Sequence, residues 1–235
     1  DALLMADQTF LLKRLIKNCA KQFNMNASFM AKPFSDEAGN GMHVHLSVVD
    51  KDGNNVFTVD KNKQPQGLFS QAIGGLLKTT PDFLSFYAPH SNSYRRLVHN
   101  GDHAPTTLSW GNENRTALIR LPEASAEATR LEFRVASADS NPYLVFASVL
   151  ASVYAGIQGK LQHDKETIGN AHAQHPPSLG VTWREAVEKT SVSSLVKDFF
   201  GEQFQQCYTC VKESEIKRFE STITDFEYHS YLRSL

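Results

Sequence analysis

The sequence predicts an α+β fold, in which short strands and longer helices both contribute to one core. Segments 39–47 and 130–135 alternate between polar and apolar residues, as strands with one buried face do. Segments 1–23 and 141–163 instead repeat apolar residues at helical spacing. With 235 residues, 41% of them hydrophobic, the chain is long enough to form one sizeable globular domain.

The first expected element is an amphipathic helix over residues 1–23. Basic residues surround its apolar positions, and four residues recur at every fourth place: Leu11, Leu15, Cys19 and Phe23. We expect this helix to back a first strand near residues 26–32.

The next element, segment 39–47, is a glycine-containing turn that runs into a short strand. Alternation places His43, His45 and Ser47 on one face and the apolar residues between them on the other. Two histidines at i and i+2 can serve neighbouring ligands, such as a divalent cation and the anionic group that the cation holds. A half-exposed strand with partly solvated histidines is the simpler alternative.

A helix follows over residues 67–79. The pair Gly74-Gly75 lies inside it and lowers helix stability, so we expect close packing or a kink there. Pro81 is expected to start another short apolar segment, which continues through Phe86.

Segment 130–135 has strict alternation, with Arg130, Glu132 and Arg134 on one face. Such a row suits a polyphosphate with its metal, because the carboxylate can hold the cation while the guanidiniums neutralise phosphate oxygens. A solvated strand face, whose mixed charges merely avoid repulsion, is the alternative.

The C-terminal part is predicted to be helical. Residues 141–163 form a long apolar helix that we assign to the core, and the polar segment 162–178 is a linker or surface loop. Two further helices, over 183–200 and 202–220, are expected to close the domain.

Composition excludes several classes of protein. The formal net charge is −1 and there is no long basic run, so nothing favours nucleic acid. No signal-peptide pattern and no membrane-length apolar stretch occur, so we expect a soluble cytoplasmic protein. The three cysteines argue against a secreted disulfide framework. Cys207 and Cys210 have the spacing of redox and zinc sites, but they lack a second pair, so a structural role is favoured.

The remaining motifs, taken in order, resemble the catalytic domain of the glutamine synthetase family. They cover most of the chain: Lys32-Pro33, Gly41-Met42-His43-x-His45, Asn92-Ser93-Tyr94-x-Arg96-Leu97, Ala104-Pro105, Asn114-Arg115, Arg120-x-Pro122, Arg130-x-Glu132-x-Arg134 and Asn141-Pro142-Tyr143. The resemblance implies a glutamine synthetase/guanido kinase-like fold, with a curved, mostly antiparallel sheet backed by helices.

The resemblance also implies ligands for the charged residues. His43 and Glu132 match ligands of one Mg²⁺ or Mn²⁺ ion, and His45 and Ser47 match positions that face the nucleotide. Contacts to ATP are implied for three arginines: Arg115, Arg120 and Arg130.

Substrate contacts are implied for Gly39, Arg96 and Arg134, where the family holds the amino-acid substrate and the intermediate. In true glutamine synthetases a glutamate just before the Ala-Pro motif closes over the intermediate and helps to take a proton from ammonium. That position is His103 here, preceded by Asp102, so we expect these two residues and Arg134 to be catalytic.

The activity that the resemblance implies is ATP-dependent ligation. The γ-phosphoryl group of ATP passes to the γ-carboxylate of glutamate, and an amine then displaces phosphate. The run from Trp110 to Thr116 is most similar to the γ-glutamylpolyamine synthetase branch, which belongs to polyamine and nitrogen metabolism and takes putrescine or a related amine. True glutamine synthetase with ammonia and a non-catalytic family member remain alternatives, and an unrelated metallohydrolase is a remote one.

The resemblance concerns only part of a family member. The family's small β-rich N-terminal domain and its other metal-binding glutamates lie upstream of the residues present here. We therefore expect residues 1–235 to be the C-terminal part of a catalytic domain, truncated at its N-terminal side and inactive alone. The family's active sites lie between subunits, so the full-length protein is expected to be a homo-oligomer.

Overall fold

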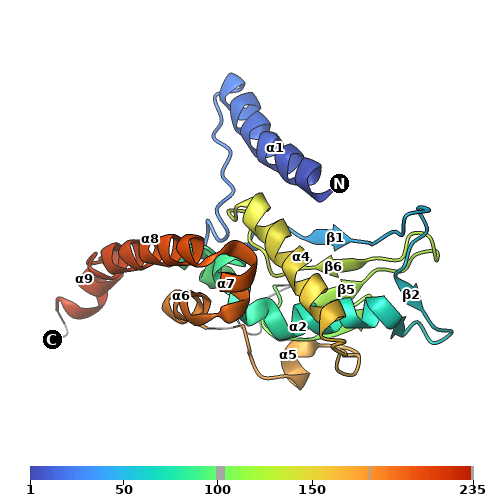
Figure 1. Ribbon diagram of the computed structural model, residues 1–235. Helices are drawn as coiled ribbons and strands as arrows, with labels where there is room; N and C mark the ends of the chain where they lie inside the picture. Colours follow the sequence, from blue (N-terminus) through green and yellow to red (C-terminus); the bar gives the residue numbers. More distant parts are fainter. Residues whose placement is uncertain (99–103, 180, 234–235) are drawn as a thin grey trace.

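The computed structural model describes residues 1–98, 104–179 and 181–233, and helices cover one face of a small sheet in it (Figure 1). The sheet has the strand order β1-β6-β5-β4. Its strands are β1 (Val44–Leu46), β6 (Leu131–Phe133), β5 (Ile119–Leu121) and β4 (Trp110–Asn112). The first two pairings are antiparallel and β4 pairs with β5 in parallel, so the predicted α+β fold with a mostly antiparallel sheet is confirmed.

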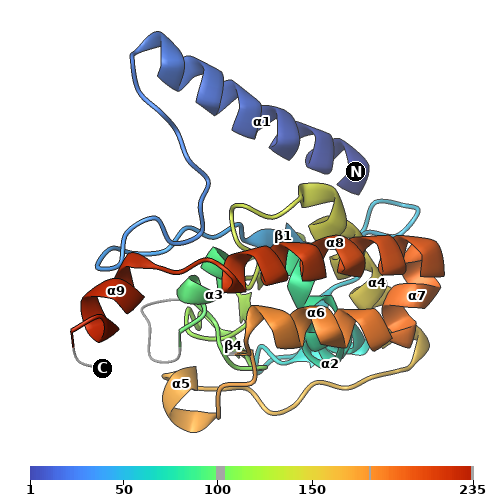
Figure 2. The same ribbon diagram turned by 90° about the vertical axis from the view of Figure 1, so that its left-hand side faces the viewer.

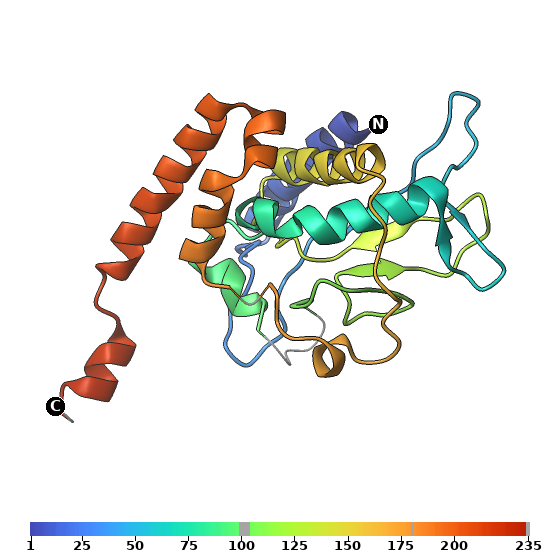
Figure 3. The ribbon, with the colours of Figure 1, turned by 60° about the horizontal axis from the view of Figure 1, so that its bottom comes forward.

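A separate hairpin joins β2 (Thr58–Val59) to β3 (Pro65–Gln66), and it leads directly into helix α2 (Gly67–Tyr87). Helix α2 lies beside α4 (Pro142–Gln158), as Figure 3 shows. A Cβ atom on Gly75 would lie 2.2 Å from the carbonyl oxygen of Ser152, so the two backbones touch at this glycine. The expected close packing at the glycine pair is therefore confirmed.

Helix α2 also corrects a prediction, because it continues through Pro81 instead of ending before it. Proline inside a helix removes a hydrogen bond and costs about 3 kcal/mol. The turns that follow Pro81 bury Phe83, Leu84, Phe86 and Tyr87. Burial of a large apolar side chain contributes about 1.5–3 kcal/mol, so packing outweighs the local penalty.

The core lies between α2, α4 and the sheet. The rings of Tyr87 and Phe133 meet edge to face at 5.0 Å, and this contact joins the end of α2 to the central strand β6. Trp110 on β4 is fully buried and donates its indole N–H to the carbonyl of Asp164 at 2.7 Å. These two contacts anchor β6 and β4 to the core, so they also hold the polar face of both strands in a fixed position.

The C-terminal helices pack beside α2, with α6 (Trp183–Val192) against α8 (Glu202–Glu220) in Figure 2. The helix expected over 183–200 is in fact two helices, α6 and α7 (Ser194–Phe200). Ser193 separates them, because its extended backbone ends α6 and its side chain accepts a hydrogen bond from the N–H of Val196. The helix predicted over 202–220 is confirmed. Short helices complete the fold: α3 (Ser91–Arg96), α5 (Ala171–Gln174) and α9 (Asp225–Tyr231).

Helix α1 (Ala2–Gln22) forms as predicted but stands apart from the sheet (Figure 1). It is attached near the start of α4, where Lys13 donates to the carbonyl of Ser140 and Tyr143 donates to Asp7. Ala6 is its one buried residue. The expectation that this helix backs a strand is therefore wrong.

Residues 26–32 also differ from the prediction, because they form no strand. The backbone of Lys32 is bonded to the side-chain amide of Asn92, which accepts from its N–H and donates to its carbonyl. The carbonyl of Ala31 accepts from the N–H of Asn40 at 2.7 Å. These isolated bonds take the place of a strand ladder. No helix in the described part of the chain has the length and apolar character needed to span a membrane.

Candidate active site

The register of the sheet gathers the charged residues around Glu132. On β6, Glu132 lies opposite His45 on one side and opposite Arg120 on the other. Side chains of directly paired residues project to the same face of a sheet. The alternation that predicted separate polar faces on two strands therefore produces one continuous polar face.

Glu132 is the centre of this face. Its side chain is 4% exposed, and one oxygen accepts from Arg134 at 2.7 Å and lies 2.8 Å from Nδ1 of His43. The other oxygen accepts from Arg120 at 2.6 Å. Burial alone would raise the pKa of Glu132, but the hydrogen bonds from His43 and Arg120 and the charge of Arg134 outweigh it and lower the pKa well below its ordinary value. The carboxylate is therefore ionised and firmly held.

Arg134 is as buried as its partner. It donates a second hydrogen bond, at 2.9 Å, to the backbone carbonyl of Arg115. Burial lowers the pKa of Arg134, although the charge of Glu132 opposes the shift. Arg134 and Glu132 form a buried pair, and loss of Glu132 would leave the buried charge of Arg134 without its carboxylate partner.

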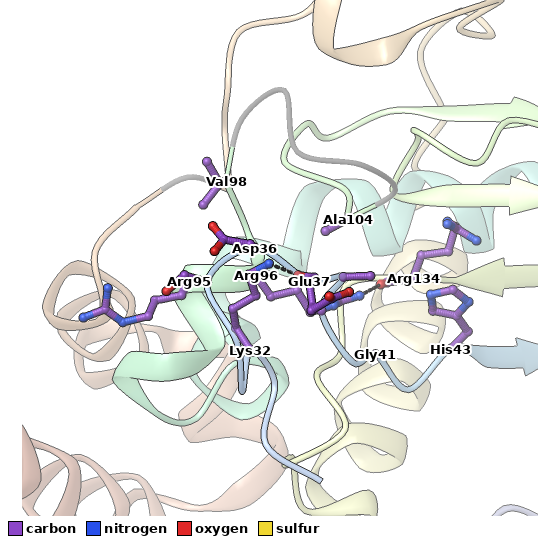
Figure 4. A pocket seen from close by; sticks show the side chains of 13 residues that line it. Lys32, Asp36, Glu37, Gly41, His43, Arg95, Arg96, Val98, Ala104 and Arg134 are labelled. Carbon is purple, nitrogen blue, oxygen red and sulfur yellow. Dashed lines mark hydrogen bonds between the residues drawn. The ribbon is translucent and has the colours of Figure 1, made fainter. Parts of the chain in front are cut away.

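A cavity of about 590 Å³ opens beside this network, and Figure 4 shows the residues that line it. His43 and Arg134 border it from the sheet, and the segment from Ser35 to Gly41 borders it from the other side. Arg95 points away from this group in the same view. The volume is typical of pockets for small molecules.

Arg96 lies buried across the floor of the cavity. Its terminal nitrogens donate to the carbonyls of Val135 at 2.9 Å and Arg134 at 3.0 Å. A Cβ atom would lie 2.9 Å from Cγ of Arg96 if built on Gly39, and 2.6 Å from its Nη2 if built on Gly41. Burial, followed by the charge of Arg134, lowers the pKa of Arg96 to about 10. The glycines of this motif thus leave room for the arginine side chain.

Three of the five residues expected beside the nucleotide lie on the β1 side of the same sheet: His45, Ser47 and Arg130. Arg130 donates to Nδ1 of His45 at 3.3 Å and does not join the Glu132 network. His45 and Ser47 line a second cavity of about 420 Å³, together with apolar residues of β1 and α4. Burial lowers the pKa of His45, with Glu132 opposing and Arg130 adding to the shift. His45 is therefore neutral near pH 7, as its acceptance of a hydrogen bond requires.

The predicted metal ligands, His43 and Glu132, are adjacent, and their donor atoms suit a divalent cation. Within the described ranges no group of three or more His, Cys, Asp or Glu side chains could hold a metal ion. Mg²⁺ and Mn²⁺ prefer several oxygen ligands. The pair fits as part of a coordination shell that substrate oxygens, water or further carboxylates complete. Asp102 and His103, which we expected to be catalytic, lie outside the described residues.

One residue of the charged network was not identified from the sequence. Glu113 accepts from the second terminal nitrogen of Arg120 at 2.7 Å, so Arg120 is held between Glu113 and Glu132. Glu113 directly precedes the Asn114-Arg115 motif. The one sequence feature that could have marked it as a site residue is that it is a carboxylate beside a cluster of arginines. The turn that directs it toward Arg120 has no distinctive sequence pattern.

The structure defines an α+β domain with a charged sheet face beside a cavity of small-molecule size, and sequence comparison gives its family. A model described as the glutamine synthetase catalytic domain matches residues 1–231. The chain therefore belongs to the glutamine synthetase family.

Individual relatives agree with this assignment. The γ-glutamylputrescine synthetase PuuA of Escherichia coli K12 is 34% identical over 234 residues, which are 100% of this chain and 49% of PuuA. A glutamine synthetase of Clostridium saccharobutylicum is 36% identical, over 99% of this chain and 54% of its own length. The γ-glutamylethanolamide synthetase GlnA4 of Streptomyces coelicolor is 34% identical, over 97% of this chain and 48% of its own length.

A solved structure, described as apo GmaS without ligand, superposes with a TM-score of 0.87 and 27% identity. The match covers 99% of this chain and 54% of that one. The chain thus spans about half the length of the relatives it matches.

Proposed function

We propose that this chain is the C-terminal part of the catalytic domain of an ATP-dependent carboxylate–amine ligase. The ligase joins glutamate to an amine such as putrescine through a γ-glutamyl phosphate intermediate. The observation that carries the proposal is the buried carboxylate of Glu132, held by His43, Arg120 and Arg134 at the edge of a small-molecule cavity. The names of PuuA and GlnA4, which specify amine acceptors, support the choice of substrate class.

The charges of the site suit phosphoryl transfer between two anions. ATP and the attacking carboxylate repel each other, so catalysis depends on cationic groups that are fixed in advance. Arg120 and Arg134 are such groups, because carboxylate and carbonyl oxygens fix their guanidiniums. A divalent cation held by His43 and Glu132 would supply further positive charge where the phosphoryl group moves. Arg130 would contact the nucleotide at the sheet edge that carries His45 and Ser47. Arg115, in the connection between β4 and β5, would contact it from the opposite side of the charged face.

The cavity would hold the amino-acid substrate and the acceptor. Gly39 offers backbone close to Arg96, whose positive charge would attract the substrate carboxylate. Asp36 and Glu37 line the same cavity and would attract a cationic amine. Asp102 or His103 would orient that amine, in place of the glutamate that true glutamine synthetases use.

Ammonia is the alternative acceptor. It is supported by the glutamine synthetases among the relatives, such as that of C. saccharobutylicum at 36% identity. The full-length ligase is expected to be a homo-oligomer with active sites between subunits, as in its family.

Phosphate release from ATP by the full-length protein tests the proposal. We expect release that requires glutamate together with putrescine, ethanolamine or another amine, at least tenfold faster than with ammonium. Glu132→Gln should abolish it, whereas Glu123→Gln, which removes an exposed carboxylate, should leave it unchanged. Release that depends on ammonium alone would favour glutamine synthetase, and no glutamate-dependent release would contradict ligase activity.

The isolated chain should give a different result. The residues that the structure describes offer one carboxylate and one imidazole to the metal site, so we expect no turnover by this chain alone. Calorimetry with Mg²⁺-ATP, alongside Glu132→Ala and Arg120→Ala, would show whether it retains part of the nucleotide site. Clear turnover by the isolated chain would contradict the expectation.

A further inference from the structure

Glu113 lies in the turn that follows β4, and its carboxylate is directed at the charged face of the sheet. One carboxylate oxygen accepts from Nη2 of Arg120 at 2.7 Å. The other accepts from the backbone N–H of Glu123, just beyond β5. Glu113 therefore ties the guanidinium of Arg120 to the strand end that follows it.

Arg120 is held from both sides. Its Nη1 donates to the buried Glu132 at 2.6 Å, and its Nη2 donates to the half-exposed Glu113. The two carboxylates fix the plane of the guanidinium, which a single partner would leave free to rotate. The hydrogen bond from Arg120 lowers the pKa of Glu113, and the bond to Glu113 is the largest cause that raises the pKa of Arg120.

The backbone at Glu113 is unusual. Its φ angle is +51°, a left-handed conformation that residues other than glycine and asparagine rarely adopt. Its N–H donates to the carbonyl of Leu121 at 3.0 Å, which closes the turn onto β5. Glycine or asparagine would fit this turn with less strain, so the shape of the turn alone does not favour glutamate.

We propose that Glu113 is a positioning residue that holds Arg120 in place to receive the phosphates of ATP. The inference rests on the proposed function, in which Arg120 contacts the nucleotide and Glu132 binds a divalent cation. Glu132 would share its carboxylate with a bound cation, and its hydrogen bond with Arg120 would then be weaker. Glu113 then keeps the guanidinium at the site, so its loss reduces affinity for nucleotide more than it reduces the rate of the chemical step.

The test compares Glu113→Gln with Glu123→Gln in the full-length protein. Each variant removes one carboxylate, and the two residues are neighbours in space because the backbone N–H of Glu123 donates to Glu113. The side chain of Glu123, however, is exposed and pairs with Lys63. Affinity for Mg²⁺-ATP is measured by calorimetry, and KM and kcat are measured by phosphate release. We expect Glu113→Gln to raise Kd and KM for ATP about tenfold and to change kcat less than about threefold, the range for loss of a partly exposed charge-assisted hydrogen bond.

A double-mutant cycle separates positioning from a purely structural role. In an Arg120→Ala background, Glu113→Gln should have no further effect on the Kd for ATP, because the group that it positions is absent. An effect that persists in that background, or an effect below twofold in the parent, would overturn the proposal. If the unsubstituted protein binds no ATP, the proposed function itself fails, whereas binding that is indifferent to Glu113 overturns the positioning role alone.

Discussion

Helices α1 and α2 have the same length, 21 residues, and nearly opposite surroundings. In α2 most residues are buried between α4, α6 and the sheet, whereas in α1 only Ala6 is buried. Both were predicted from apolar periodicity, because that pattern reports which residues could share a face. The comparison shows that periodicity predicts a helix without predicting what covers its apolar face.

The two helices also use different contacts. Helix α2 meets α4 backbone to backbone at Gly75 and continues through Pro81 because its last turns are fully packed. Helix α1 is attached by the hydrogen bonds of Lys13 to Ser140 and of Tyr143 to Asp7, both at the start of α4. Packing decides the stability of α2, and a few polar contacts decide the position of α1.

The largest effect should come from a core substitution in α2. Leu76 is 0% exposed, so Leu76→Ala removes buried methyl groups and leaves a cavity. We expect the free energy of unfolding to fall by about 2–5 kcal/mol. Urea denaturation of the chain, followed by circular dichroism, measures the loss. A loss below about 1 kcal/mol would show that α2 is not the centre of the core.

A smaller but more specific loss is expected at the helix crossing. Alanine normally stabilises a helix by about 1 kcal/mol relative to glycine. In Gly75→Ala the new Cβ atom would clash with the backbone of α4, so we expect a destabilisation of about 1–3 kcal/mol. Lys78→Ala, at an exposed position of the same helix, is the control and should change stability by less than about 0.5 kcal/mol. A stabilised Gly75→Ala variant would contradict the close contact between α2 and α4.

The sequence predicted much of the candidate site, since alternation on two strands is enough to assign side chains to a face. His43, Glu132 and Arg134 meet as expected, because β1 and β6 pair in register. Arg120 joins them from β5. Once the order of the strands is known, the pairing of Arg120 with Glu132 explains its position. Arg130 does not join them, because it bonds to His45 at the edge of the sheet.

Other features depend on contacts that no local pattern encodes. The path of Arg96 past Gly39 and Gly41 depends on where α3 lies relative to the segment before β1. The link between Glu113 and Arg120 depends on a left-handed turn at a residue that does not favour one. The break at Ser193 depends on its extended backbone, which ends α6, and on its hydroxyl, which caps the start of α7. Such details follow from tertiary packing, which periodicity does not report.

The smallest effect is expected at an exposed leucine of α1. Leu15 is 59% exposed, so Leu15→Ala removes little buried surface, and alanine has the better helix propensity. We expect the free energy of unfolding to change by less than about 0.5 kcal/mol under the conditions used for Leu76→Ala. A loss near 2 kcal/mol would mean that the apolar face of α1 is covered in solution, for instance by a second copy of the chain. Repeating the denaturation over a hundredfold range of protein concentration separates these cases, because only a stability gained by association rises with concentration.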